Sequence, residues 1–401
     1  MLFTFPFSKG VMFQGQYIFS QLTTLLPKQK FDDLVKYYEG NKGVRHFTCW
    51  NQLNCMVFGQ LTSRESLRDL NLAIYAHKSK SYHMGFGKNV SLANFSNANA
   101  KRNYKIFEDF AFYLIEQTRK ALALKEDFSD INTEIYAIDA SIIDLCLDVF
   151  WWARFKETKA GLKLNVVHDI KTDIPAFIHI SEAKEHDVKF LDIVVFEPGA
   201  FYILDRGYFD FSRLFRIKQN QAYFVIRAKK NTQYKRQYSI KKDPEQPNIL
   251  SDQIVKFTGK KASNRYPDKI RKVRYYDPET DRIFIYLTNN FVLPAKDIAK
   301  LYKHRWSIEL FFKWVKQHMK IKSFWGTNPN AVKIQIYSAV IGYCLVALAR
   351  KNLNLSQTNY EILQVLSVSF FDKSPMNQLF TKSNSKKDNS LEKNQLKISF
   401  I

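Results

Sequence analysis

Three acidic residues, Asp139, Asp205 and Glu309, stand in sequence settings that suit catalysis. Asp139 in "YAIDAS" and Asp205 in "YILDRGY" each follow an apolar run typical of a β-strand, so we expect each at the end of a strand. An ionised carboxylate that is buried without a partner is costly, so such an acid should lie at the strand tip and face a cation. Either acid alone is more simply a cap or turn residue. Two of them predict a shared cation site, because ligands gather at the carboxyl ends of strands in α/β sheets.

Glu309 is the one carboxylate in "LYKHRWSIELFFKWVKQHMK" (301–320), among seven residues that are Lys, Arg or His. As a single helix with about 100° per residue, this stretch places its polar residues on one narrow stripe. The stripe contains Tyr302, Arg305, Glu309, Lys313, Lys316 and Lys320. Apolar and aromatic residues fill most of the remaining circumference, which predicts a helix buried on most sides with the stripe facing a site. The alternative is an exposed Arg305–Glu309–Lys313 ion-pair ladder, which leaves the surrounding aromatic residues unexplained.

The three carboxylates suit hard metal ions. Mg²⁺ and Mn²⁺ prefer oxygen ligands and keep waters or phosphate oxygens in their coordination shell. Two such ions about 3.5–4 Å apart can activate a water or a 3′-hydroxyl and stabilise the leaving oxygen of a phosphodiester. Tyr302, Arg305 and Lys316 would then hold the phosphates of a DNA end next to the acids.

The net charge of the chain indicates a polyanionic partner. The 61 Lys and Arg residues exceed the 38 Asp and Glu residues, which gives a formal charge of +23. This favours DNA, RNA or an anionic membrane, whereas the alternative is a merely basic protein. The longest apolar run, residues 334–349, is shorter than the roughly 20 residues that span a bilayer, so we expect a buried core helix there and no membrane partner.

The basic residues are concentrated in two segments. Residues 227–242 contain seven Lys or Arg and no acid, and residues 260–274 contain seven against the single acid Asp268. Tyrosines lie between them, so the surface suits a phosphate backbone and unstacked bases. Lys229, Lys230 and Arg236 are therefore candidate DNA-binding residues, and the alternative is a solvated charged face.

The expected elements place these residues in an α/β fold. Residues 1–130 are predicted helical, with a capping box of Thr62 and Glu65 opening one helix and another helix over 101–124. From residue 131 the pattern predicts a mixed sheet covered by helices, followed by short strands in 231–292 and helices over 295–320 and 329–351.

This pattern predicts four parts. They are a helical N-terminal domain (1–130), an α/β catalytic core (131–230 and 293–368), a β-rich insertion (231–292) and a polar C-terminal tail (369–401). The N-terminal domain is expected to bind DNA ends, and the alternative is an ordinary small helical bundle. The four cysteines have no spacing typical of a zinc site or a disulfide framework, which favours a reducing compartment.

The spacing Tyr302-x2-Arg305-x3-Glu309-x6-Lys316 resembles the Y-R-E-K signature of DDE transposases of the insertion-sequence-four family. "AIDAS" resembles the first-Asp strand of that family, and "LDRGYFDF" resembles its second-Asp motif. Residues 91–115 also resemble the small N-terminal domain that often precedes its catalytic region. The resemblance implies a ribonuclease-H-like core with a β-rich insertion between the second Asp and the Glu.

The resemblance also implies the function. Asp139, Asp205 and Glu309 would bind two Mg²⁺ ions, for which Mn²⁺ can substitute, while Tyr302, Arg305 and Lys316 contact terminal phosphates. The enzyme would cleave the ends of a transposon and join the 3′-hydroxyl to target DNA. Its partners would be double-stranded DNA, as terminal inverted repeats and as target, and a second copy in a synaptic homodimer. It would act in the bacterial cytoplasm, on the nucleoid.

Two other functions stay open, a stand-alone nuclease of the same fold and a DNA-binding regulator without catalysis. Some relatives stack a flipped base on a tryptophan of the insertion, but this chain has no Trp between Trp152 and Trp306. Tyr275, Tyr276 or Tyr286 is the candidate substitute.

Overall fold

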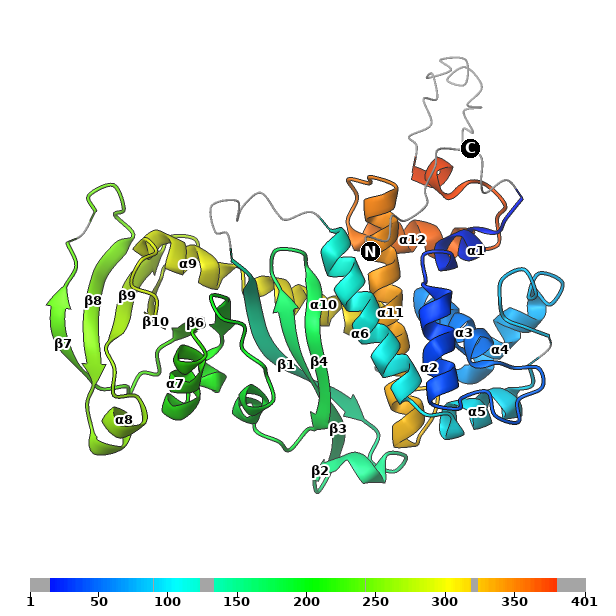
Figure 1. Ribbon diagram of the computed structural model, residues 1–401, viewed down its shortest axis with the longest axis horizontal. Coiled ribbons are helices and arrows are strands. Elements are labelled where there is room, and N and C mark those ends of the chain that lie inside the picture. Colours follow the sequence, from blue (N-terminus) through cyan, green and yellow to red (C-terminus); the bar gives the residue numbers. More distant parts are fainter. Residues whose placement is uncertain (1–14, 89, 123–132, 242, 319–323, 381–401) are drawn as a thin grey trace, which may run out of the picture.

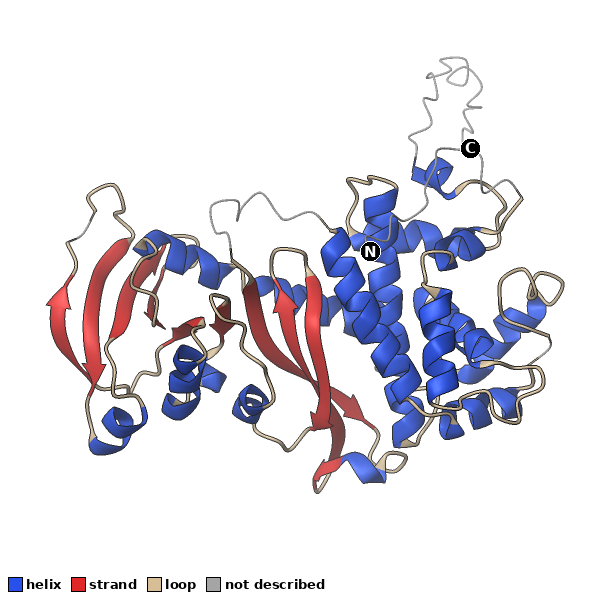
Figure 2. Ribbon diagram, in the orientation of Figure 1, coloured by secondary structure: helices blue, strands red, loops and turns tan. Residues whose placement is uncertain are grey.

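The computed structural model describes residues 15–88, 90–122, 133–241, 243–318 and 324–380 (Figure 1). The molecule is elongated. Helices gather at one end and a long sheet extends from them to the other end (Figure 2). The end of the predicted tail, residues 381–401, lies outside the described residues.

In the described residues between 15 and 122, six helices form the N-terminal region. Their bounds are α1 Ile18–Thr23, α2 Lys28–Tyr37, α3 Cys49–Leu61, α4 Leu67–Ala76, α5 Leu92–Lys101 and α6 Lys105–Ala121. This confirms the predicted helical character of the described residues before 122. Helix α3 is at the centre of the bundle, because eleven of its thirteen residues are buried.

Two details of the predicted helices are wrong. Ser66, and not Thr62, caps α4, since its hydroxyl accepts from the backbone N–H of Asp69 at 3.1 Å. Thr62 instead ends α3, where Ser63 adopts a left-handed φ of 53°. The predicted helix over 101–124 is broken near its start, because Arg102 has an extended backbone and α6 begins only at Lys105.

Ten strands in the described part of the chain form one sheet. They are β1 Ile135–Leu145, β2 Arg154–Lys156, β3 Lys159–Asp169, β4 Ile174–Glu182, β5 Phe201–Leu204, β6 Tyr223–Arg227, β7 Tyr234–Ser239, β8 Ile249–Phe257, β9 Ile270–Asp277 and β10 Arg282–Thr288. Strand β3 pairs antiparallel with both β4 and β1, and β1, β5 and β6 are parallel. This ribonuclease-H-like arrangement confirms the predicted fold class.

The sheet continues beyond the parallel strands. Strand β10 pairs antiparallel with β6, and β9, β8 and β7 follow in that order to the outer edge. The strands of segment 231–292 therefore extend the central sheet at the end of the molecule away from the helical bundle (Figure 1).

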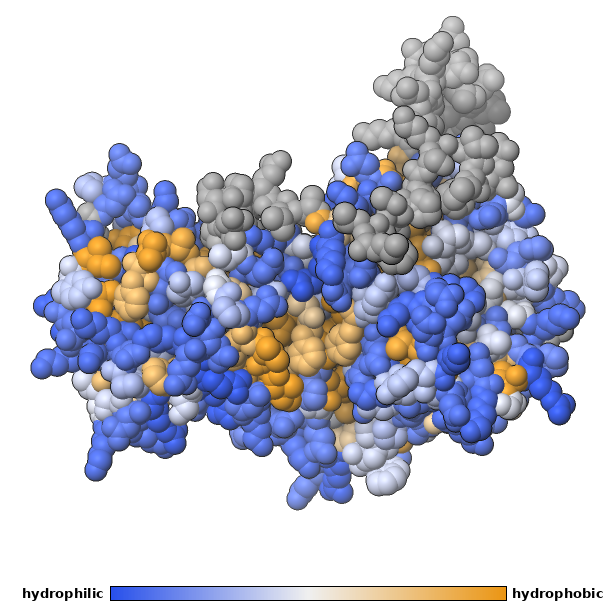
Figure 3. Space-filling view, in the orientation of Figure 1, coloured by the Kyte–Doolittle hydropathy of each residue, from blue (hydrophilic) through white to orange (hydrophobic). Residues whose placement is uncertain are grey.

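Alternating residues of the central strands pack into two cores. In β5, Phe201 and Ile203 belong to the larger core, while Tyr202 and Leu204 belong to the smaller one. The larger core also contains residues of α6, α10 and α11, and the smaller one contains residues of α7 (Phe211–Gln219) and the neighbourhood of α8 (Lys260–Arg265). Both faces of the sheet are thus covered, which is why these strands are apolar throughout. Most side chains on the viewed surface are hydrophilic, with apolar ones gathered near the middle (Figure 3).

The C-terminal helices are α9 Ala295–Lys303, α10 Trp306–His318, α11 Pro329–Asn352 and α12 Asn359–Ser369. The single helix predicted over 295–320 is therefore two helices with a break at 304–305. Helix α11 is long and apolar enough to cross a membrane, but 94% of its most apolar window is buried inside the protein, which confirms the expected core helix. Beyond α12, Phe370 is fully buried and packs edge-on against Phe19 of α1.

Candidate active site

Asp139 and Asp205 are neighbours at the point where two parallel strands stop pairing. The last pair in the register of β1 and β5 is Ile138 with Leu204, so the next residue on each strand is an aspartate. Asp205 follows the end of β5, as predicted. The prediction that Asp139 ends its strand is wrong, because β1 continues to Leu145 through its antiparallel pairing with β3.

Helix α10 brings Glu309 to the same place. Helix α9 ends at Lys303, and the chain turns through His304 and Arg305 before α10 begins at Trp306. Helix α10 packs against β1. Tyr302 at the end of α9 donates a long hydrogen bond of 3.4 Å to a carboxylate oxygen of Asp205. The break therefore directs residues of both helices toward the two aspartates.

Arg305 connects two of the three acids. Its Nη1 donates to Asp139 Oδ2 at 3.0 Å, and its Nη2 donates to Glu309 Oε1. The side chains of Arg305 and Asp139 are 16% and 23% exposed, so this ion pair is largely desolvated, whereas the Glu309 side chain is 34% exposed. Within one site, the structure thus brings together Asp139, Asp205, Glu309, Tyr302 and Arg305.

The electrostatics of the site show that the acids share one environment. The pKa of Asp139 is raised to about 6, chiefly by burial and also by the charges of Asp205 and Glu309, while the Ala140 backbone N–H and Arg305 oppose the rise. Burial also raises the pKa of Tyr302 to about 12, so this hydroxyl stays protonated and can donate. The cluster carries more negative charge than Arg305 alone neutralises.

The donor set fits a divalent cation in its chemistry. Three carboxylates are the hard oxygen ligands that Mg²⁺ and Mn²⁺ prefer, and their mutual repulsion favours a cation between them. As they stand, no group of three acidic, His or Cys side chains among the described residues is arranged to hold a metal ion. The guanidinium of Arg305 already lies between Asp139 and Glu309. Coordination by all three acids would require Arg305 to release these two.

The surroundings of α10 differ in part from the predicted helix. Ile308, Phe311 and Val315 are buried, as an inward face requires. Trp306 is 59% exposed and Leu310 is 49% exposed, so the prediction that apolar residues bury the helix on most sides is wrong for these two. The break before Trp306 turns this side of the helix outward. Lys320 of the predicted stripe lies outside the described residues.

The other candidate DNA-binding residues lie on α10, just after β6 and on the edge strand β7. Lys316 is half-buried on α10, two turns after Glu309. Lys229 follows β6 and donates to the backbone carbonyl of Phe209 at 3.1 Å, and Lys230 beside it is exposed. Arg236 is exposed on the edge strand β7, far along the sheet from β5. The structure does not bring Arg236 to the three acids.

Lys229 also lines a cavity of about 520 Å³. Asp210, Lys260, Lys261 and Arg265 line it as well. Because β5 and β6 are parallel, the ends of both strands, and hence Asp205 and Lys229, lie at the same edge of the sheet. A basic surface therefore begins close to the acidic site.

Sequence reasoning missed two residues of the site. The Tyr208 hydroxyl is buried and has no hydrogen-bond partner among the residues that the structure describes. Burial together with the charges of Asp139, Asp187 and Asp205 raises the pKa of Tyr208. Arg227 ends β6, and its charge opposes the rise in the pKa of Tyr302. Arg227 could have been found from its place at the end of a strand parallel to the strand of Asp205. Tyr208 has no such signal.

Tyr275, Tyr276 and Tyr286, the candidates to stack a flipped base in place of a tryptophan, differ in how much of their rings is exposed. Tyr286 is 3% exposed and packs against Tyr302 with ring centroids 4.7 Å apart, so its face is already occupied. Tyr275 and Tyr276 are half-buried, and the Tyr276 hydroxyl donates to Asp281 at 2.9 Å. Of the three, Tyr275 and Tyr276 retain exposed ring surface.

Comparisons with known proteins find matching family models and several relatives. Residues 131–345 match the model of the family described as "Transposase DDE domain", and residues 14–87 match one described as "Domain of unknown function (DUF4372)". A protein described as transposase y4zB of Sinorhizobium fredii is 34% identical over 64% of this chain and 70% of its own length. A transposase of the insertion sequence element IS4SA from Synechocystis is 27% identical over 65% of this chain and 72% of its own length.

A more distant relative is the transposase for insertion sequence element IS231D of Bacillus thuringiensis, which is 23% identical over 46% of this chain and 49% of its own length. Among solved structures, a piggyBac transposase synaptic complex with hairpin DNA aligns with 94% of this chain and 84% of its own, at 10% identity and a TM-score of 0.45. That likeness is too low to carry an argument.

Proposed function

Because the chain belongs to the family of DDE transposases, we propose that it cuts the ends of its own transposon and joins the freed 3′-hydroxyl to target DNA. The observation that carries this proposal is the meeting of Asp139, Asp205 and Glu309 from two strands and one helix at a single basic edge. Acids converging from three elements with one guanidinium between them are not explained by helix capping or by an exposed ion-pair ladder.

The site residues have separate roles in this proposal. Asp139, Asp205 and Glu309 would hold two Mg²⁺ ions, for which Mn²⁺ can substitute. When bound, these ions would activate the attacking water or 3′-hydroxyl and stabilise the leaving oxygen. The donors of Arg305 move from the carboxylates to a phosphate of the DNA end, and Lys316 adds positive charge from the same helix. Tyr302, protonated at neutral pH, donates to a phosphate or to Asp205.

The remaining parts of the chain would position DNA around this centre. We assign the core to residues 131–230 and 293–368, DNA-end binding to residues 1–130, and a further DNA contact to the β-rich segment 231–292. Lys229, Lys230 and Arg236 would contact the backbone along that segment. A homodimer would bridge the two transposon ends, in the bacterial cytoplasm and on the nucleoid.

The experiment is an end-processing assay. The purified protein is incubated with Mg²⁺ and duplexes made from the DNA that flanks its gene, with a supercoiled plasmid as target. We expect nicks at the inverted-repeat ends and joined products, both lost in Asp205→Asn. Cleavage without joining would favour the stand-alone nuclease. Binding without any metal-dependent cleavage would favour the regulator and contradict the proposal.

A further inference from the structure

The region around α5 differs from the rest of the N-terminal bundle in its surface. Residues 70–107 contain six Lys or Arg and no Asp or Glu. Helix α5, Leu92–Lys101, buries Phe95, Ala98 and Asn99. Its outer face is made of small or amide side chains and one lysine. The exposed residues are Ala93, Asn94, Ser96, Asn97 and Lys101.

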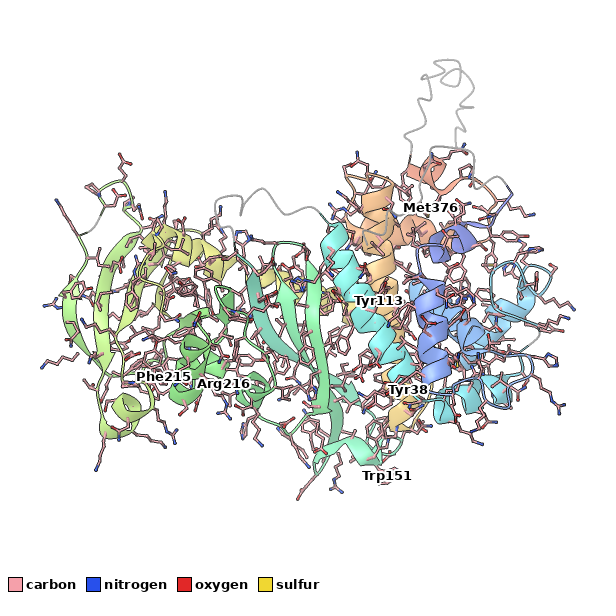
Figure 4. All side chains as sticks on the ribbon, viewed as in Figure 1. Tyr38, Tyr113, Trp151, Phe215, Arg216 and Met376 are labelled. Atoms are coloured by element: carbon pink, nitrogen blue, oxygen red, sulfur yellow. The ribbon has the colours of Figure 1, made fainter. Side chains whose placement is uncertain are left out.

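A cavity of about 860 Å³ lies along this face. Asn94, Asn97 and Lys101, spaced one turn apart on α5, form one wall, and the loop of residues 39–47 forms the other. Tyr38 at the end of α2, labelled in Figure 4, also lines it. Among its described lining residues, five are Lys or Arg and one, Glu39, is acidic.

Most of this positive charge is not neutralised by neighbours. Lys42 pairs with Glu39 at 2.9 Å. Within the described part of the chain, Arg45, Lys88 and Lys101 have no carboxylate within ion-pair distance, and all three are exposed. A polyanion would therefore meet three available cations at the rim and two amides between them.

Partly buried hydrogen bonds hold the wall of α5 in place. Arg102, just after the helix, donates to the carbonyl of Thr48 at 3.0 Å and to Gln52 Oε1 at 2.8 Å. The side-chain amide of Asn330 on α11 donates to the carbonyls of Asn99 and Arg102 at 2.9 and 2.6 Å. The surface is thus tied to the helices of the core and is preorganised for a partner.

We propose that the outer face of α5 enters the major groove of duplex DNA and reads bases through Asn94 and Asn97, while Arg45, Lys88 and Lys101 hold the flanking phosphates. An asparagine side chain offers a donor and an acceptor, which matches the edge of adenine, and small neighbours permit close approach. A single strand is less suited, because the aromatic residues of the lining, Tyr38 and Phe47, are half-buried or buried. The inference rests on the proposed function, since it names the surface that selects the transposon ends.

The test is a selection of bound duplexes from a library with 30 random base pairs. It uses the full chain with Glu309→Gln, which prevents cleavage. We expect a sequence motif to be enriched. In Asn94→Ala/Asn97→Ala, at least one motif position should lose its preference and affinity for the motif should fall about 5- to 150-fold. Affinity for duplexes without the motif should not change.

The phosphate contacts have their own readout. Arg45→Ala/Lys88→Ala should weaken binding to all duplexes and reduce the slope of log affinity against log salt by about 2. The matched control for Asn94→Ala/Asn97→Ala is Asn352→Ala/Asn377→Ala, which removes two exposed amides in the C-terminal part of the chain. This control should change neither the selected motif nor the salt dependence of binding.

Three results would overturn the inference. They are no enriched motif, an unchanged motif in Asn94→Ala/Asn97→Ala, or variants that alter only the oligomeric state in light scattering, which would indicate a protein partner. Failure of the proposed function would look different. The protein would select a motif through α5 but would not cut its ends with Mg²⁺.

Discussion

Arg305 is the residue in the site with the most contacts to its acids. It donates to Asp139 at 3.0 Å and also to Glu309, and it opposes the rise that burial causes in the pKa of Asp139. In the protein without metal it therefore acts as the cation that permits two half-buried carboxylates to lie close together. Metal binding by these acids and phosphate binding by Arg305 would both require Arg305 to release the two carboxylates.

Replacing Arg305 by Ala should destabilise the metal-free protein by about 1–3 kcal/mol, because two partly buried charges lose their partner. Mn²⁺ should then raise the melting temperature of the variant more than that of the wild type, since no guanidinium competes for the acids. Thermal unfolding with and without Mn²⁺ measures both effects, and Lys313→Ala, an exposed cation on the same helix, is the control. Equal stability of Arg305→Ala and wild type without metal would show that Arg305 does not hold the acids.

A second ion pair anchors the helix that follows the Asp205 motif. Arg213 on α7 donates to both oxygens of Asp192, at 2.9 and 2.6 Å. These hydrogen bonds lower the pKa of Asp192, and the nearby charges of Arg216 and Lys189 lower it by smaller amounts. The ion pair therefore stabilises the fold fully at pH values above the pKa of Asp192 in the unfolded chain, which is about 3.9. This stabilisation is lost as the pH falls through the lower pKa that Asp192 has in the folded protein.

Asp192→Asn should therefore be less stable than wild type at pH 7, by no more than about 1 kcal/mol because the pair is half-exposed. The difference should vanish as pH falls well below 4. Urea unfolding at several pH values measures it, with the exposed Asp148→Asn as the control. A stability difference that is the same at pH 3 and pH 7 would show that the pair does not couple folding to Asp192 ionisation.

Helix α3 contacts the segment after α10 at Gly59, which packs against Trp325. Gly59 is buried in α3, and a Cβ added there would lie 2.8 Å from Leu70 and closer still to Trp325. The Trp325 ring donates to the carbonyl of Arg64 at 3.1 Å. A residue beyond the candidate active site thus packs directly on the N-terminal bundle.

Gly59→Ala should cost about 1–3 kcal/mol through overpacking, although alanine is the better helix former. Trp325→Leu opens space, so the double variant should be more stable than the sum of the two single changes predicts. Denaturant unfolding of the wild type, the two single variants and the double variant gives the four free energies of unfolding for this double-mutant cycle. Additive effects would mean that the two residues do not share one packed contact.

How far the elements can be predicted from the sequence depends on whether their signals are local. The position of Asp205 is predictable because its strand is short and ends where its apolar run ends. The position of Asp139 within its strand is not, because β1 is prolonged by pairing with β3, a partner some twenty residues away that no local pattern identifies. The break at 304–305 has no local signal, because it contains neither proline nor glycine. Its cause is tertiary, since Tyr302 and Arg305 are drawn toward acids more than ninety residues earlier in the chain.

At the scale of the whole molecule, one apolar core joins the N-terminal bundle to the catalytic sheet. Phe19 of α1, Ile203 of β5 and Val340 of α11 all belong to it. Met376, labelled in Figure 4, belongs to it too, so the chain after α12 returns to the bundle. The proposed DNA-reading face of α5 and the acidic site therefore belong to elements that share one continuous core.

The central claim is that Asp139, Asp205 and Glu309 form a single divalent-metal site. The most direct measurement is the Mn²⁺ affinity of the DNA-bound protein, followed by electron paramagnetic resonance. We predict that Asp139→Asn, Asp205→Asn and Glu309→Gln each weaken Mn²⁺ binding by at least about tenfold, and that Asp144→Asn, an exposed acid on β1, does not. Wild-type Mn²⁺ affinity in all three variants, with DNA binding intact, would contradict the claim.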